Sequence, residues 1–119
     1  MDVFAELARN RTIDITTTGA RSGEQRRIET WAWPLDGVFY LTGSPGRRDW
    51  YANLKGEPSF TVHLKRGVQA DLPARARRIE DPSERREVFT RLIGGSGYDL
   101  EAWIAGSPLV EVEFTSLQP

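Results

Sequence analysis

The alternation of hydrophobic and polar residues divides the chain into short strands separated by tight turns. Asp36-Gly37 is a dipeptide typical of two-residue hairpins, and apolar side chains occupy every second position from Ser59 to Lys65. Segments rich in β-branched and aromatic residues predict strands at 12–18, 25–35, 38–42, 59–65, 68–79 and 109–114. Because hairpins predominate, we expect a mainly β (α+β) fold whose six antiparallel strands close into a small barrel.

Short flanking helices are predicted over 3–9, 49–54, 81–93 and 99–104. Asp49 is placed to cap the second helix. Asp81 has the same place before the third helix, with Pro82 following at the first helical position. Glycines at 56 and 94–95 are expected to end these two helices.

Composition places the chain among ordinary globular proteins and excludes several kinds of chemistry. It has 119 residues, of which 39% are hydrophobic, so we expect a single domain over residues 1–119. An apolar run near the ~18 residues of a membrane span is absent, and the acidic first residues argue against a signal peptide, which predicts a cytoplasmic protein. Cysteine is absent and His63 is the only histidine, so no metal site is expected.

Charge gives no overall preference for nucleic acid, because the formal net charge is −1. The cations are nevertheless unusual in kind, with fourteen arginines against two lysines. Arginine offers a planar fork that matches phosphate and carboxylate oxygens. Arg75, Arg77 and Arg78 are expected to form a face that is either solvated or the rim of an interface.

The segment from Gly19 to Arg27 is the first candidate site. Its glycines permit a tight turn with exposed N–H groups. Arg21, Ser22 and Arg26 supply donors suited to phosphate. The local pattern by itself favours a solvated hairpin end over an anion site.

A second candidate loop follows the strand at 38–42. It joins Thr42, Gly43, Ser44, Gly46 and Arg47 to the start of the helix that carries Trp50. Small residues, cations and a helix N-terminus together favour an anion. Both candidate loops follow strands and are expected to meet at one barrel rim.

Aromatic residues and the histidine are interpreted by strand parity. Trp31 and Trp33 share one face, opposite Ala32, so at least one of these tryptophans is expected to pack inward. His63 lies opposite Phe60, Val62 and Leu64, which predicts a solvated histidine rather than a catalytic one.

Taken together, two sequence segments resemble the corresponding segments of the deazaflavin-dependent nitroreductase family. They are Thr16-Thr17-Thr18-Gly19-Ala20-Arg21-Ser22-Gly23-Glu24-Gln25-Arg26 and Trp50-Tyr51-Ala52-Asn53-Leu54-Lys55 with Pro58, joined by Asp36-Gly37, Ser44 and Gly46. The likeness extends from about residue 12 to 114. It implies a split β-barrel like that of FMN-binding, pyridoxamine-phosphate-oxidase-like proteins.

The resemblance also implies a function. Such enzymes transfer a hydride from the reduced deazaflavin coenzyme F-420 (an 8-hydroxy-5-deazaflavin) to a small nitro, quinone or enone acceptor. By position, Arg21, Ser22 and Arg26 would hold the acidic tail, and Trp31 and Trp50 would wall the ring pocket. The ring loop would comprise Thr42, Gly43, Ser44, Gly46 and Arg47.

Substrate contacts are assigned to Tyr98 and Trp103, with Tyr98 the candidate proton donor. The loop before Trp50 is shorter than in the family and lacks its lysine, a cation that Arg47 or Arg48 would replace. An FMN-dependent oxidoreductase on the same barrel and a non-catalytic barrel that binds a cofactor or an apolar ligand are the alternatives. Either a monomer or a homodimer is compatible with the sequence.

Overall fold

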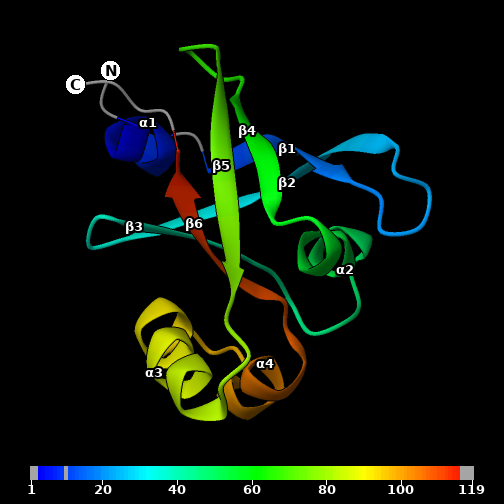
Figure 1. The fold of residues 1–119 in the computed structure, drawn as a ribbon. Coiled ribbons are helices and arrows are strands. Elements are labelled where there is room, and N and C mark those ends of the chain that lie inside the picture. Colours follow the sequence, from blue (N-terminus) through cyan, green and yellow to red (C-terminus); the bar gives the residue numbers. More distant parts are fainter. Residues whose placement is uncertain (1–2, 10, 116–119) are drawn as a thin grey trace.

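The computed structural model describes residues 3–9 and 11–115 (Figure 1). The strands are β1 (Thr12–Thr18), β2 (Gln25–Leu35), β3 (Val38–Thr42), β4 (Ser59–Leu64), β5 (Ala70–Arg78) and β6 (Leu109–Phe114). The helices are α1 (Val3–Arg9), α2 (Asp49–Gly56), α3 (Pro82–Ile93) and α4 (Leu100–Gly106). Every predicted strand and helix is present.

The six strands form a closed antiparallel barrel in the order β1-β2-β3-β6-β5-β4, with β4 pairing back onto β1. Alternate residues point inward, as period-two patterning requires. The interior is filled by a cluster that includes Ile13, Ile15, Phe39, Val62 and Val110, all fully buried. The predicted small barrel is therefore confirmed, with a packed core rather than a channel.

Two helices complete this core from outside the strands. Val3 and Leu7 of α1, and Trp50 and Leu54 of α2, are buried members of the barrel cluster. Figure 1 shows the two helices on different sides of the barrel. No helix in the described part of the chain combines the length and apolar character that crossing a membrane would need.

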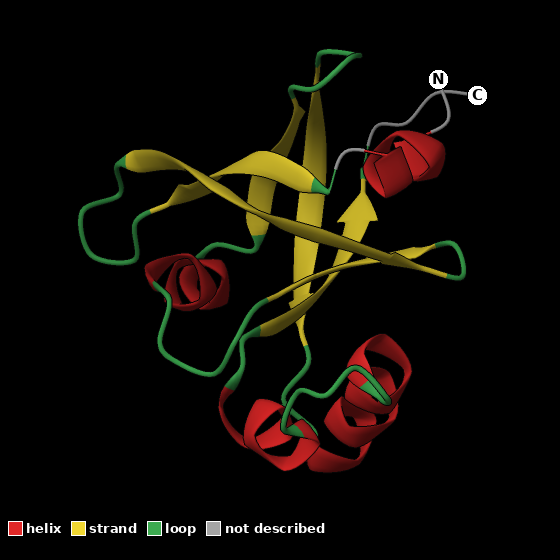
Figure 2. Cartoon of the chain, turned by 180° about the vertical axis from the view of Figure 1, so that it is seen from behind, coloured by secondary structure: helices red, strands yellow, loops and turns green. Residues whose placement is uncertain are grey.

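A second hydrophobic cluster lies between the outer face of the barrel and the helices α3 and α4, which stand together at one end (Figure 2). Trp33 packs edge-on against Trp103 of α4 at 6.2 Å between ring centroids. Trp103 meets Phe89 of α3 in the same manner at 6.0 Å. The expectation that a tryptophan of this strand packs inward was wrong, because Ala32 faces the barrel core while Trp33 is partly buried in this outer cluster.

Turn chemistry explains the strand connections. Asp36 and Gly37 both have positive φ, 50° and 77°, which is the two-residue hairpin conformation that Asp-Gly favours.

Asp81 caps α3 by accepting a hydrogen bond from the Glu84 N–H at 2.9 Å, as predicted. The prediction for Asp49 was wrong. Arg48 occupies the N-cap position without a side-chain hydrogen bond, and Asp49 is the first helical residue.

Candidate functional site

A cavity of about 640 Å³ opens where β2 leaves the barrel, beside the end of β3, the start of α2 and the segment leading into α4. Its lining comprises Arg11, Ile28, Glu29, Thr30, Trp31, Ala32, Trp33, Thr42, Gly43, Ser44, Arg48, Trp50, Tyr98 and Trp103. The volume falls within the range typical of small-molecule sites, roughly 300–1,000 Å³.

Large aromatic side chains form walls of this cavity. Trp31 and Tyr98 are 56% and 57% exposed, whereas Trp50 and Trp103 are buried. Tyr98 stacks on Trp103 with 5.0 Å between ring centroids and 24° between planes. Exposed aromatic surface of this kind is typical of a ligand or partner site, and flat rings present faces on which a planar molecule stacks.

One wall of the cavity is an open strand edge. β2 pairs with β1 along Gln25 to Trp31, but β3 pairs only with Ala32 to Leu35. Between residues 25 and 31, the second edge of β2 therefore pairs with no other strand of the described chain. Backbone N–H and C=O groups along such an edge need acceptors and donors, which water or a ligand supplies.

Arg48 organises the loop that follows β3. Its Nη1 donates to the Gly46 carbonyl and its Nη2 to the Ser44 carbonyl, each at 2.9 Å. Gly46 adopts φ 141° and its N–H donates to the Gly106 carbonyl at 3.0 Å, so the loop is also tied to α4. A Cβ at Gly43 would lie 3.1 Å from Arg48 Nη2, so a larger residue there would require this guanidinium to shift by a few tenths of an ångström.

The Gly19–Gly23 turn is anchored to α2 by Asn53. The buried Asn53 side chain accepts a hydrogen bond from the Ala20 N–H at 3.0 Å and donates to Thr17 Oγ1 at 3.1 Å. This contact fixes the turn against the barrel and leaves the side chains of Arg21 and Ser22 exposed. Asn53, in the segment from Trp50 to Lys55, thus links the first predicted loop and β1 to helix α2.

The predicted site residues separate into three groups. Those that line the cavity are Trp31, Thr42, Gly43, Ser44, Trp50, Tyr98 and Trp103. Arg21, Ser22 and Arg26 lie outside it on the projecting β1–β2 hairpin, and Gly46 and Arg47 line a different hollow behind the loop. Arg48, named in the sequence analysis as an alternative to Arg47 for the missing cation, also lines the cavity. Lining residues that were not assigned to the site from the sequence are Arg11, Ile28, Glu29, Thr30, Ala32 and Trp33. Strand parity at 28–32 was the available signal for some of them.

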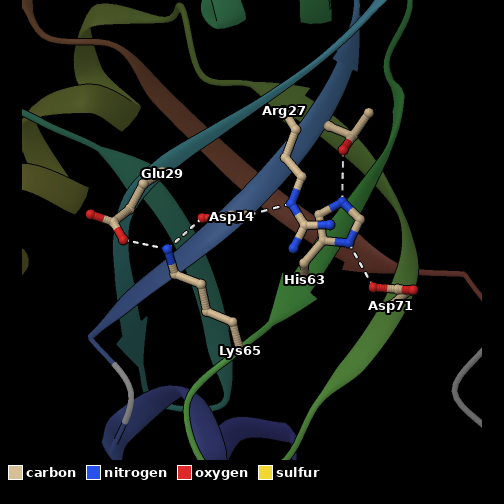
Figure 3. Close-up of polar contacts among 7 residues, drawn as sticks. Asp14, Arg27, Glu29, His63, Lys65 and Asp71 are labelled. Carbon is tan, nitrogen blue, oxygen red and sulfur yellow. Dashed lines mark hydrogen bonds and ion pairs between the residues drawn. The ribbon is translucent and has the colours of Figure 1, made fainter.

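A polar network covers the outer face of β1, β2, β4 and β5 (Figure 3). His63 Nε2 contacts Thr16 Oγ1 and its Nδ1 contacts Asp71 Oδ1, both at 2.7 Å. The prediction of a solvated His63 was wrong, because the neighbouring strands leave its residue surface only 8% exposed. The contact with His63 holds the pKa of Asp71 below its ordinary value.

Asp14 is the centre of the second half of this network. It lies 2.6 Å from Lys65 Nζ and 2.9 Å from Arg27 Nε, and Lys65 also contacts Glu29. Hydrogen bonds from Lys65 and Arg27 lower the pKa of Asp14 despite the opposing effect of burial. Arg27 therefore lies on the outer face of β2, and its neighbour Arg26 lies on the opposite face of the same strand.

Comparison with known proteins agrees with this geometry. A family model described as F420H(2)-dependent quinone reductase matches residues 3–98. None of the curated proteins matches the chain in sequence. A structure described as an F420-H2 dependent reductase (FDR-A) is similar with 26% identity and a TM-score of 0.62, covering 87% of this chain and 94% of that one.

Two further solved structures are similar in fold. A candidate pyridoxamine 5'-phosphate oxidase from Listeria innocua has a TM-score of 0.68 at 11% identity, covering 96% of this chain and 91% of the other. A protein described as a domain-swapped dimer has a TM-score of 0.60 at 24% identity, covering 87% and 80%. The barrel is thus of the split, pyridoxamine-phosphate-oxidase-like type.

Proposed function

Because the chain belongs to the F420H(2)-dependent quinone reductase family, a family of oxidoreductases, we propose that it takes its hydride from the reduced deazaflavin coenzyme F-420. The acceptor we assign is a small quinone, with nitro and enone compounds as chemically related acceptors. The observation that supports the proposal is the aromatic-walled cavity beside the open edge of β2, whose ring faces and free backbone groups would suit a flat polar ring.

The residues present fit a ring with carbonyl groups. Trp33 lines the cavity, and its buried Nε1 has no acceptor within the described residues, so a ligand carbonyl that reached this N–H would satisfy it. Trp31, Trp50 and the Tyr98–Trp103 stack would contact the ring faces. The loop fixed by Arg48 would place the backbone of Gly43 and Ser44 against the ring edge.

The tail of the cofactor would lie along the projecting hairpin. Among the described residues, no acidic side chain pairs with Arg21 or Arg26, in contrast to Arg27. Their guanidinium groups are therefore available to a phosphate or carboxylate. Since Asn53 fixes the turn before any ligand arrives, less conformational freedom is lost on binding.

The hydride chemistry is supplied by the bound deazaflavin, and the protein orients it and excludes water. Tyr98 Oη is the candidate proton donor to an acceptor that has received a hydride. Tyr98 also covers Trp103, so it would lie between the acceptor and solvent. No nucleophilic side chain is required.

The test is titration of the purified protein with oxidised and reduced coenzyme F-420, followed by tryptophan fluorescence. We expect saturable quenching, weakened in Arg21→Gln and Arg26→Gln and unchanged in Arg27→Gln. Arg27 is the matched control because it is adjacent in sequence but faces Asp14.

Parallel titration with FMN, followed by turnover assays on quinone and nitro acceptors, separates the alternatives. Saturation by FMN but not by the deazaflavin would replace the proposal with a flavin enzyme. Deazaflavin binding without turnover of any acceptor would instead indicate a cofactor carrier.

A further inference from the structure

A second hollow of about 480 Å³ lies behind the loop that follows β3, on the side away from the aromatic cavity. Its lining includes the side chains of Arg47, Arg78 and Arg85, against a single acid, Glu80. The whole chain carries a net charge of −1, so this concentration of positive charge is local. None of these residues lines the aromatic cavity proposed for the deazaflavin.

Arg85 places a fixed positive charge at the base of the hollow. Its residue surface is 8% exposed, and its guanidinium donates to the carbonyls of Ile79 and Ile104 at 2.8 Å and of Ser107 at 2.5 Å. No carboxylate of the described residues neutralises it. The guanidinium also lies over the Phe89 ring, 5.4 Å from its centroid. A buried cation that carbonyl dipoles and an aromatic ring stabilise, but no carboxylate neutralises, leaves a positive potential that a nearby anion would relieve.

Arg78 contributes donors that the described chain does not use. It stands at the end of β5 on the inward face, and its side chain is 16% exposed. The guanidinium stacks over the Tyr51 ring at 4.0 Å, with Nη2 3.6 Å from Glu80 Oε1. Its Nε and Nη1 atoms are buried without an acceptor. Because stacking rather than hydrogen bonding holds this group, it can turn without breaking a hydrogen bond.

Ser107 and Arg47 add further polar groups at the same place. Ser107 is 3% exposed, and its Oγ has no hydrogen-bond partner among the described residues. Arg47 is exposed at the mouth and forms no ion pair within the described part of the chain. Buried donors in folded proteins are nearly always paired, so this set points to an acceptor that the chain does not itself provide.

We propose that this hollow binds the phosphate or carboxylate group of a small metabolite, at a site separate from the deazaflavin cavity. An oxyanion accepts several guanidinium N–H bonds at once, which matches the unused donors of Arg78 and the free fork of Arg47. Glu80 is the natural group to be displaced, since its side chain is 62% exposed and only loosely paired. The site goes beyond the proposed hydride transfer.

The test is calorimetric titration of the whole chain, without cofactor, with inorganic phosphate and separately with succinate at constant ionic strength. We expect saturable binding of at least one of these anions that depends on Arg47 and Arg78, and the anion that binds more tightly identifies the ligand class. Arg78→Gln and Arg47→Gln should each weaken binding by ~10-fold or more, because each removes charge-assisted hydrogen bonds. Arg75→Gln, an exposed arginine on the same strand, should leave the affinity unchanged.

Arg47→Gln keeps the test decisive if Arg78→Gln fails to fold, because Arg47 is exposed. Absence of saturable binding of both anions would overturn the proposal, as would equal weakening in Arg75→Gln. Weakening in Arg21→Gln but not in Arg47→Gln would also overturn it, by placing the anion at the Gly19–Gly23 turn. Failure of the deazaflavin titration would leave this result untouched.

Discussion

Replacing Arg85 with methionine tests how the two C-terminal helices are joined to the barrel. The guanidinium donates to Ile104 and Ser107 at the end of α4 and to Ile79 at the end of the barrel segment before α3. It therefore supplies hydrogen bonds to terminal helix carbonyls that have no partner within the helix. Methionine keeps the apolar stem but removes every donor.

The expected cost follows from these contacts. Hydrogen bonds to a charged group contribute about 1.5–3 kcal/mol each, and carbonyls left buried without a donor carry an additional penalty. Water will satisfy part of the set, because the hollow beside Arg85 is open. We expect Arg85→Met to reduce the free energy of unfolding by about 3–5 kcal/mol. This loss corresponds to a Tm lowered by roughly 10–20 °C for a chain of this size.

Urea unfolding followed by circular dichroism measures the change, with the midpoint falling and the slope m unchanged. Arg86→Met is the matched control. Arg86 is the next residue of α3 and forms a bidentate pair with Glu101 at 2.7 and 2.8 Å, but that pair is exposed. Arg86→Met should therefore lower the free energy of unfolding by much less than Arg85→Met does. A loss below about 1 kcal/mol for Arg85→Met would refute the argument that this arginine joins α4 to the barrel.

Three further outcomes are expected. Asn53→Ala should reduce the free energy of unfolding by about 1–3 kcal/mol, measured by urea unfolding, because it leaves the Ala20 N–H without its acceptor. Trp31→Ala should weaken deazaflavin binding by roughly tenfold in the fluorescence titration, while the exposed site keeps stability within about 0.5 kcal/mol. Asp14 has a lowered pKa, so its contacts stabilise the fold above the unfolded value of about 3.9 and are lost as the pH falls through the folded pKa. Acid titration of stability should therefore be less steep in Asp14→Asn.

Controls for these variants come from the same chain. Val68→Ala removes another exposed apolar side chain, far in sequence from the cavity lining, and should leave cofactor affinity unchanged. An equal loss of cofactor affinity in Trp31→Ala and Val68→Ala would contradict a stacking role for Trp31. Unchanged stability in Asn53→Ala would show that the turn holds its shape without α2, and identical acid profiles for Asp14→Asn and the native protein would rule out the Asp14 contribution.

The fold could be predicted because its signals are local. Asp36-Gly37 has the conformation its sequence favours, and the strands at 12–18, 25–35, 38–42 and 109–114 have the predicted ends. The predicted strand at 68–79 corresponds to β5, which starts at Ala70 after a turn in which Gly67 adopts φ 76°. The exact ends of the strands thus depend on backbone conformation, which the alternation of hydrophobic and polar residues does not determine.

The site was harder to predict from the sequence, because it depends on how far along their length neighbouring strands pair. Parity correctly placed His63 on the face of its strand opposite Phe60, Val62 and Leu64. It could not show that β1 and β5 flank His63 and bury it, since burial depends on neighbours distant in sequence. In the same way, nothing near Arg85 in the sequence indicates that carbonyls from residues 79, 104 and 107 will surround it.

Asn53 shows how two weak local signals become one structural unit. The glycine turn at 19–23 and the helix at 49–56 are each ordinary in isolation. One buried amide joins them by accepting from the turn and donating to Thr17 on β1. Because an unpaired buried amide is costly, the turn, the strand and the helix must be arranged together. The joint spacing of the two strings therefore carries more information than either string, and it positions the Arg21 turn before any ligand binds.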